Sequence, residues 1–285
     1  MRGNKAKFAW FARKTAVAGL AVVVAASTSL CAVADDARPS WREIWKWREV
    51  WSGVDAAKDN WLIYSGMTVA PFGHIHEPGW RFRMAGGYGQ YQYTGNRGTG
   101  PTPDIRSFAA MTYYGDALVG YLERYGPLTA KAFAGVSYLA HDIAPFDPDN
   151  LVTGEEVGFK AALELWVDIG EIGFASLDAS WNTAHDTRNV RTRLGARFAP
   201  SWSGGLEGWL NLDDQSDCDL GWSGGDACDE EETDLLDYTR AGLFLRYDWD
   251  GGELSLSGGV SGGSFGSSGS ASPEPYATLN WMTQF

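Results

Sequence analysis

The sequence predicts an all-β fold, an antiparallel up-and-down transmembrane β-barrel of about twelve strands and of the outer-membrane type. Three observations predict it. From Val50 onward, segments of about 9–12 residues alternate apolar and polar side chains. The connections between these segments are short on one side and mostly long on the other. The chain ends on Phe285, with apolar residues at alternate positions before it, at Ala277, Leu279 and Trp281.

Composition narrows the class of protein further. The 285 residues include 36 Asp and Glu against 23 Lys and Arg, which gives a formal net charge of -13. A nucleic-acid partner is therefore not expected, because such a protein needs basic surface to displace the counterions of phosphate groups. Aromatic residues make up 14% of the chain, and this share argues against a disordered protein.

The first 34 residues have the pattern of a secretory signal peptide. A basic start is followed by a nearly apolar segment at 15–30 and by the small-residue site Ala32-Val33-Ala34. We expect cleavage after Ala34 and Sec-dependent export in a Gram-negative bacterium, with the outer membrane as the destination. A lipoprotein site at Cys31 is the weaker alternative, because the bulky Leu30 precedes it.

Residues 35–47 are expected to form a periplasmic segment that precedes a barrel at 48–285. Ser40 and Glu43 have the spacing of a capping box, so a short amphipathic helix is one interpretation of residues 40–51. A long first strand is the other interpretation, because periodicity does not separate short segments of the two kinds.

The segment 154–168 shows the strand alternation most clearly. Val157 and Leu163 share one face, and Lys160 and Glu164 share the other. A soluble barrel buries its apolar face whereas a membrane barrel turns it toward lipid, and alternation alone does not choose between them. The expected strands cover residues 48–56, 61–70, 79–93, 107–124, 127–140, 154–168, 172–182, 188–199, 205–211, 236–248, 252–262 and 275–285.

Loops and aromatic residues favour the membrane barrel. With the N-terminus in the periplasm, the turns on that side are mostly very short, and the outer connections are mostly long and polar. The expected turns are 71–78, 125–126, 169–171, 200–204 and 249–251, and the expected outer loops are 57–60, 94–106, 141–153, 183–187, 212–235 and 263–274. Aromatic residues near strand ends are expected at the level of the lipid headgroups, namely Trp61, Trp80, Tyr93, Tyr121, Tyr125, Trp181, Trp249 and Trp281. For some of them, an ordinary core position is the alternative.

The polar face of the strands is expected to line the lumen. Unpaired buried charges are costly, so the favoured interpretation is a set of ion pairs that brace the barrel from within. A narrow charged channel is the alternative, and inward rings such as Phe133 and Trp166 would suit a path for sugars. Bulky side chains that fill a small lumen explain the same residues. The lumen-facing candidates are Arg81, Arg83, Lys131, Phe133, Lys160, Glu164, Trp166, Arg191, Arg193, Arg240 and Arg246.

The acidic loop 212–235 contains Cys218 and Cys228, the two cysteines that remain after the expected cleavage. An even pair in an exported chain predicts a disulfide, which would close this loop. Ca²⁺ binding by the carboxylates of the loop is a weaker alternative to a solvated loop, because the spacing of an EF-hand is missing.

No catalytic residue, metal site or cofactor is expected. Ser261 lies in a G-x-S-x-G match, but a nucleophile elbow requires a helix after the strand, and none is expected there. His74 and His76 form an H-x-H pair in an expected turn, with no evident third ligand.

Seven segments together resemble the cellulose biosynthesis protein BcsS family. They are WSGVDA (51–56), GMTVAPFG (66–73), GWRFRMAGGYG (79–89), GPLTAKAFAG (126–135), DPDN (147–150), GEEVGFK (154–160) and RYDWDGGELSLSGG (246–259). The order and spacing of the segments carry the resemblance, and the acidic cysteine loop looks like an insertion. The resemblance implies an outer-membrane-type protein linked to bacterial cellulose synthesis, and it brings no active-site residues with it.

The functional hypothesis is a non-catalytic outer-membrane barrel that is accessory to cellulose biosynthesis or secretion, as a scaffold or as a narrow glucan conduit. Its expected partners are outer-membrane lipid and either a cellulose chain or components of the synthesis and secretion machinery. The alternatives are a general porin or oligosaccharide channel and, less favoured, a barrel hydrolase of lipid or glycan acting through Ser261 or His185.

Overall fold

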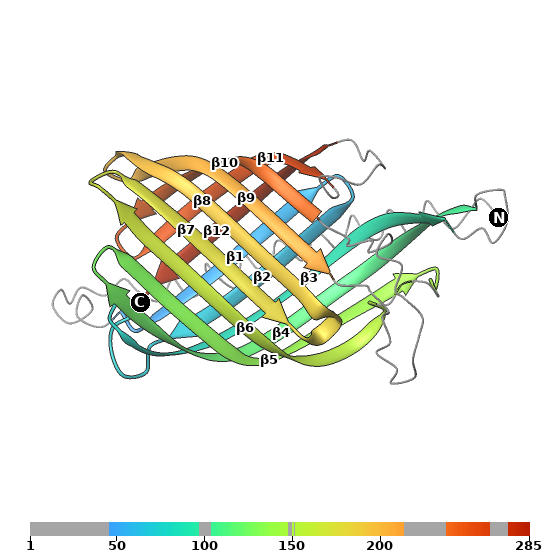
Figure 1. The fold of residues 1–285 in the computed structure, drawn as a ribbon, viewed down its shortest axis with the longest axis horizontal. Helices are drawn as coiled ribbons and strands as arrows, with labels where there is room; N and C mark the ends of the chain where they lie inside the picture. The colour runs from blue at the N-terminus through green and yellow to red at the C-terminus, as the bar shows by residue number, and fades with distance from the viewer. Residues whose placement is uncertain (1–45, 97–103, 148–149, 151, 214–237, 263–272) are drawn as a thin grey trace, which may run out of the picture. The chain divides into compact units, whose positions relative to one another are not determined.

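The chain forms a closed β-barrel (Figure 1). The computed structural model describes residues 46–96, 104–147, 150, 152–213, 238–262 and 273–285. Every strand pairs antiparallel with the strands before and after it, and β1 (Arg48–Ala57) pairs with β12 (Glu274–Gln284). This last pairing removes the free edge that an open sheet would present. The predicted up-and-down barrel of twelve antiparallel strands is confirmed.

The observed strands lie close to the predicted ones. The largest differences are at β9, which begins at Trp202 and not at residue 205, and at β5, which continues to Ala144. The remaining strands are β2 (Asn60–Val69), β3 (Gly79–Asn96), β4 (Ile105–Tyr125), β5 (Leu128–Ala144), β6 (Gly154–Ile169), β7 (Gly173–Asn182), β8 (Thr187–Ala199), β9 (Trp202–Asp213), β10 (Tyr238–Trp249) and β11 (Gly252–Gly262).

Some predictions fall outside the described residues. These are the signal peptide at 1–34, most of the segment at 35–47, and the Cys218–Cys228 disulfide with its acidic loop. For residues 48–51, the helical interpretation is wrong, because this part of the chain pairs with both β2 and β12.

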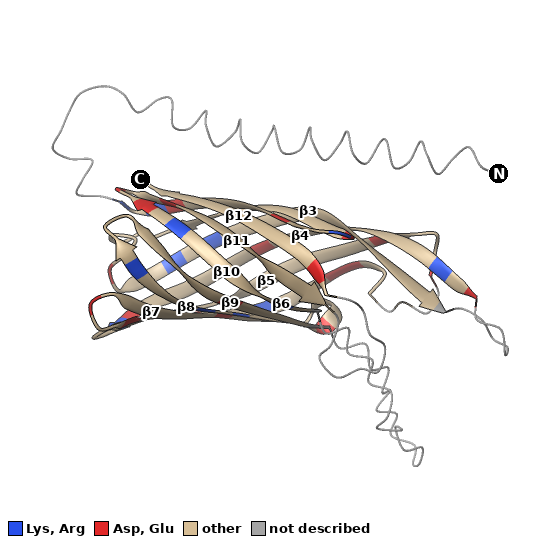
Figure 2. Ribbon diagram, turned by 90° about the horizontal axis from the view of Figure 1, so that it is seen from above, with Lys and Arg blue, Asp and Glu red and all other residues tan. Residues whose placement is uncertain are grey.

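The outer face of the barrel is apolar. Val157, Leu194 and Leu243 have exposed fractions of 71%, 56% and 64%. On the opposite face of β10, Arg240 and Phe244 are only 8% and 4% exposed. Charged positions occur along the strands as well as at their ends (Figure 2), and the alternation turns those in the middle of the strands inward. A continuous apolar belt around an ion-rich interior is the arrangement of a barrel embedded in lipid.

The two ends of the barrel differ in their connections. At the end that holds Phe285, β4 and β5 are joined by residues 126–127, and β10 and β11 by residues 250–251. Gly126 and Gly251 have φ angles of +61° and +82°, a backbone region that glycine adopts without strain. The opposite end carries the longer connections, as the sequence predicts. Among the described residues, no helix has the length and apolar character needed to cross a membrane.

Glycines on the inner wall leave room for aromatic rings from neighbouring strands. At Gly195, an added Cβ would lie 2.6 Å from Cζ of Phe174 and 2.8 Å from Cζ of Phe244. At Gly66, it would lie 2.2 Å from the indole ring of Trp51. The rings therefore occupy the space that a side chain would need, and they fill part of the lumen.

We expect Gly195→Ala to lower the free energy of unfolding by about 1–3 kcal/mol, because the new methyl group must displace two packed rings. Chemical denaturation in detergent micelles measures the change. Gly115→Ala is the matched control, since nothing lies within 4 Å of the added Cβ. It should stay within about 0.5 kcal/mol of the wild type. Equal destabilisation by both substitutions would contradict the packing argument.

Strands β3, β4 and β5 extend beyond the rim at the end with the long connections (Figure 1). On their inner side, Phe108 and Ile143 belong to a small buried core, and Tyr91 and Tyr93 pack against it. The hydroxyl of Tyr93 donates to Asp147 Oδ2 at 2.7 Å. The prediction that Tyr93 lies at the headgroup level is therefore wrong, because the residue is on the inward face of β3.

Candidate functional site: the barrel lumen

The lumen is crossed by side-chain contacts between strands that are not neighbours. Arg83 on β3 forms an ion pair with Glu164 on β6, although β4 and β5 lie between these strands. Lys131 Nζ lies 3.3 Å from the second carboxylate oxygen of Glu164. The guanidinium of Arg83 also lies 3.8 Å from the ring centroid of Phe133. Four of the predicted lumen-facing residues thus form one contact group.

A second group links β4 to β7. Lys160 Nζ lies 2.6 Å from Asp116 Oδ2, and the hydroxyl of Ser137 donates to Asp116 Oδ1 at 2.6 Å. Asn182 Nδ2 donates to the Ser137 hydroxyl at 3.0 Å. Asp116 is buried, so the ion pair and the hydrogen bond together offset the cost of removing its charge from water.

The third group is centred on Glu207, whose side chain is fully buried. Arg191 Nη2 and Arg193 Nε each lie 2.6 Å from Glu207 Oε2. The hydroxyls of Ser257 and Tyr276 donate to the same carboxylate from β11 and β12, at 3.2 and 3.4 Å. One carboxylate therefore connects four strands, two of which are not its neighbours in the sheet.

Two further ion-pair groups lie in the lumen, and the first of them joins strands that are not neighbours. Arg240 on β10 donates through both terminal nitrogens to Asp55 on β1, one of them at 2.7 Å, and Thr278 donates to the same carboxylate at 2.9 Å. The Asp55 and Arg240 side chains are 6% and 7% exposed. Nearer the end that holds Phe285, Arg246 Nε lies 3.1 Å from Asp248 Oδ2. The ionic contacts thus extend along the length of the lumen.

Guanidinium groups lie over several inward-facing aromatic rings. The distances from the guanidinium carbon Cζ to the ring centroid are 4.7 Å for Arg193 and Phe244, 5.0 Å for Arg246 and Trp166, 5.2 Å for Arg191 and Trp209, and 4.9 Å for Arg240 and Tyr276. Trp166 also stacks on Phe174 at 4.5 Å. Cation–π contacts stabilise this packing, and they occupy ring faces that a sugar would need.

Arg81 has a different role from the other candidates. It is 2% exposed, and its guanidinium donates to the carbonyl oxygens of His74 at 3.1 Å and Ile75 at 3.0 Å, and also to that of Glu77. These bonds hold the turn 70–78 against the barrel, with Ile75 buried. Arg81 therefore stabilises a turn through hydrogen bonds from its guanidinium to backbone carbonyl oxygens.

The same end of the barrel contains the H-x-H pair. His76 Nε2 lies 2.8 Å from Gln284 Oε1, and its ring centroid is 5.4 Å from that of His74. Burial lowers the pKa of His76, although the contact with Gln284 opposes this shift. Both residues lie in a turn, as expected. In the part of the chain that the structure describes, no cluster of three or more His, Cys, Asp or Glu side chains could hold a metal ion.

At the other end, the short 3₁₀ turn η1 (Ala184–Asp186) packs against the inner wall. Ala184 is fully buried, and its amide nitrogen lies 2.4 Å from the position that a Cβ on Gly158 would take. The ring of His185 lies 5.3 Å from that of His141, and the backbone N–H of His185 donates to Glu156. Burial lowers the pKa of His185, although the charge of Glu156 opposes this shift.

Ser261 and His185, the candidates for a hydrolase site, make contacts that do not activate a nucleophile. The Ser261 hydroxyl donates to the backbone carbonyl of Glu274 at 3.0 Å, and a carbonyl oxygen is not a base that would activate it. The partners of His185 among the described residues are His141 and Glu156. No nucleophile–base pair is assembled from Ser261 and His185 in these contacts.

One hollow lies inside the lumen, with a volume of about 180 Å³. The side chains of Arg83, Asp116, Lys160, Glu164 and Asp178 line it, together with Trp51, Tyr114 and Asn189. The hollow thus lies between the first and second contact groups. We call it the Asp178 cavity.

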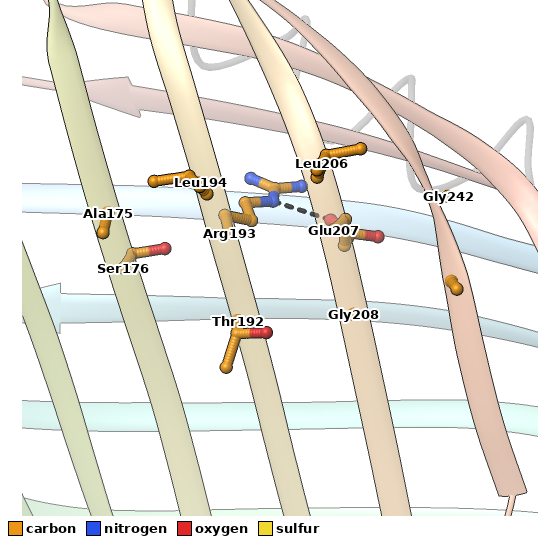
Figure 3. Close-up of a pocket in the computed structure, with 10 residues that line it drawn as sticks. Ala175, Ser176, Thr192, Arg193, Leu194, Leu206, Glu207, Gly208 and Gly242 are labelled. Atoms are coloured by element: carbon orange, nitrogen blue, oxygen red, sulfur yellow. Dashed lines mark hydrogen bonds and ion pairs between the residues drawn. The ribbon is translucent and has the colours of Figure 1, made fainter.

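The second hollow is a depression of about 530 Å³ over β7 to β10 (Figure 3). Leu194 and Leu206 border it, and they are 56% and 59% exposed as members of the apolar belt. In Figure 3, Arg193 and Glu207 are joined to each other by their ion pair. Since its border is the lipid-facing surface, this depression is suited to lipid acyl chains.

The predicted candidates are mostly basic, and apart from Glu164 they do not include the acidic residues that pair with them. Asp55, Asp116 and Glu207 are buried and accept the bonds of Arg240, Lys160, and the pair Arg191 and Arg193. Alternation was the available signal, because Asp55 and Glu207 lie on the polar face of their strands.

Comparisons with known proteins give a family and several barrels. A family model described as cellulose biosynthesis protein BcsS matches residues 50–272. No curated protein matches the chain. Similar solved structures include the KdgM porin, with 7% identity, a TM-score of 0.42 and coverage of 83% of this chain and 99% of that one. The translocator domain of the autotransporter NalP from Neisseria meningitidis has 10% identity, a TM-score of 0.44 and coverage of 95% and 98%. An outer membrane channel from Pseudomonas putida F1 has 12% identity, a TM-score of 0.42 and coverage of 84% and 94%.

Proposed function

Since the chain belongs to the cellulose biosynthesis protein BcsS family, we propose that it is a non-catalytic barrel of the outer membrane that serves cellulose biosynthesis as a scaffold with a closed lumen. The apolar belt supports insertion in lipid. The short turns at the end that holds Phe285 support a periplasmic location of that end.

The ion pairs that cross the lumen are the observation that favours a scaffold over a channel. Arg83 and Glu164 pair across two intervening strands, and Asp55 and Arg240 also pair between strands that are not neighbours. A polymer that passes through would have to separate such pairs and leave buried charges without partners, which is costly. The barrel therefore contributes a rigid surface in the membrane, with its loops and its periplasmic turns available to the synthesis or secretion machinery.

A narrow glucan conduit is the second candidate. The inward rings of Phe133, Trp166 and Phe244 favour it, because aromatic faces suit the apolar faces of sugar rings. This function requires a second state in which the guanidinium groups leave those rings.

Deletion of the gene tests the role in cellulose biosynthesis. We expect extracellular cellulose to fall while the cellulose synthase stays intact in the membranes, because a scaffold acts after or beside the synthase. Restoring the full chain should restore the output. Normal cellulose output from the deletion strain would refute the proposed function.

Planar bilayers test whether the lumen is closed. The purified barrel is expected to give no steady ion conductance, because ionic braces fill its lumen. The triple variant Arg83→Ser, Lys131→Ser and Glu164→Ser removes all three charged side chains of the first contact group. Conductance should therefore rise above the wild-type background. Steady conductance from the wild type would instead identify a porin or an oligosaccharide channel.

A further inference from the structure

The Asp178 cavity is large enough for a ligand. At about 30 Å³ for each water molecule, its 180 Å³ would hold about six waters or one small polar molecule. Its walls come from β1, β3, β4, β6, β7 and β8, so most of them belong to strands that the bracing contacts already fix. A ligand would therefore meet a preorganised site.

The charged groups that line the cavity are paired, with the exception of Asp178. Glu164 accepts from Arg83 and Lys131, and Asp116 accepts from Lys160 and Ser137. Asp178 forms no hydrogen bond or ion pair with any described residue. A carboxylate in a partly enclosed site requires donors, so the cavity needs an occupant that supplies hydroxyl or N–H groups.

The charge balance indicates what kind of occupant fits. Three carboxylates, of Asp116, Glu164 and Asp178, line the cavity together with two cations, of Arg83 and Lys160. Lys131 beside Glu164 and Arg191 opposite Asp178 add positive charge at its margin, so charges of both signs surround the space. A strongly charged ligand would upset this balance in an environment where charge is poorly solvated. An uncharged molecule with several hydroxyl groups leaves the balance intact and supplies the donor that Asp178 lacks.

An aromatic ring also lines the cavity. The indole of Trp51 lies over Gly66, where a Cβ would approach it to 2.2 Å. Arg or Lys groups lie over Phe133, Trp166 and Phe244, whereas no described Lys or Arg lies over Trp51. Trp51 therefore keeps an apolar surface toward the cavity, and the C–H face of a pyranose ring can pack on such a surface.

We infer that the Asp178 cavity binds one uncharged hexose unit, with Asp178 accepting from a sugar hydroxyl and Trp51 packing against the C–H face of the ring. The choice of a glucosyl unit rests on the proposed role in cellulose biosynthesis, whereas the site itself rests on the cavity. The inference adds a sugar-recognition site to a barrel whose lumen is otherwise braced shut.

Calorimetric titration of the purified full barrel with glucose and with cellobiose tests this site. We expect saturable binding of at least one of the two sugars by the wild type. Asp178→Asn should weaken it at least about tenfold, because a hydrogen bond to a charged acceptor becomes a neutral one. Trp51→Leu should weaken binding as well, through the lost ring contact. Heat-modifiable gel mobility verifies that each variant is folded.

Asp168→Asn is the matched control, because it makes the same chemical change at a lumen position outside the cavity, where Asp168 pairs with Arg197 at 2.9 Å. Its affinity should equal that of the wild type. Absence of sugar binding by the wild type, or equal affinity of Asp178→Asn, would overturn the inference. A deletion strain with lowered cellulose but a barrel that binds no sugar would refute the site and leave the proposed function standing. Normal cellulose output from the deletion strain, together with intact sugar binding by the barrel, would refute the proposed function and leave the site standing.

Discussion

Asp55→Ala is expected to lower the free energy of unfolding by about 3–5 kcal/mol, the range for a buried ion pair that loses one partner. Arg240 is 8% exposed, and its guanidinium would lose both of the hydrogen bonds that it donates to the Asp55 carboxylate. Thr278 would also lose the acceptor of its hydroxyl. Denaturant titration of the barrel in micelles measures the change.

Two variants show whether burial causes this effect. Asp250→Ala breaks an ion pair with Lys46 in which the Asp250 side chain is 87% exposed, so the loss of stability should be far smaller than for Asp55→Ala. The hydrogen bond from Lys46 lowers the pKa of Asp250, but the exposed position keeps its contribution small. The double variant Asp55→Leu with Arg240→Met should recover most of the stability, because it leaves no buried charge. Similar losses for Asp55→Ala and Asp250→Ala would show that the lumen screens its charges as bulk water does.

The fold was predictable because its signals are local. The alternation around Val157 and Lys160 and the short turns at Gly126 and Gly251 can be read within about ten residues of sequence. The same alternation assigns Arg191, Arg193, Arg240 and Arg246 to the polar face, and these side chains make their contacts in the lumen. A period of two residues thus defines both the lipid-facing side and the ionic side.

The pairing inside the lumen was not predictable, because it depends on strand tilt and on contacts across the barrel. Asp55 and Arg240 are 185 positions apart, and no local pattern joins them. Arg81 has the same parity as Arg83, yet it binds the carbonyls of a turn, since it lies one residue after Trp80 at the start of β3. The predicted headgroup position of Tyr93 is wrong because β3 continues to Asn96, past the predicted end of the strand at residue 93. The alternation along β3 already places Tyr93 on the lumen side.

Leu243→Arg is expected to lower the free energy of unfolding in lipid vesicles by about 2–4 kcal/mol, the cost of placing an arginine near the middle of the bilayer on a lipid-facing strand. Leu243 lies in the middle of β10 and is 64% exposed, and its register partners are Leu206 on β9 and Gly258 on β11. The guanidinium would have to enter hydrocarbon or distort the bilayer to reach water. Reversible folding into vesicles of phosphatidylcholine measures the difference.

For a barrel in water, the same substitution is expected to have little effect on stability. The experiment therefore distinguishes a lipid-facing surface from a water-facing one. An exposed leucine on a soluble protein can become arginine with a change of about 0.5 kcal/mol or less. Phe72→Arg is the matched control, because Phe72 is 83% exposed but lies in the turn 70–78, outside the strands. It should cost about 0–1 kcal/mol, as expected near the interface. If Leu243→Arg cost no more than Phe72→Arg, the apolar belt would not be in contact with lipid. The ionic interior would then need another explanation, because a barrel in water has no reason to place its charges inside and its leucines outside.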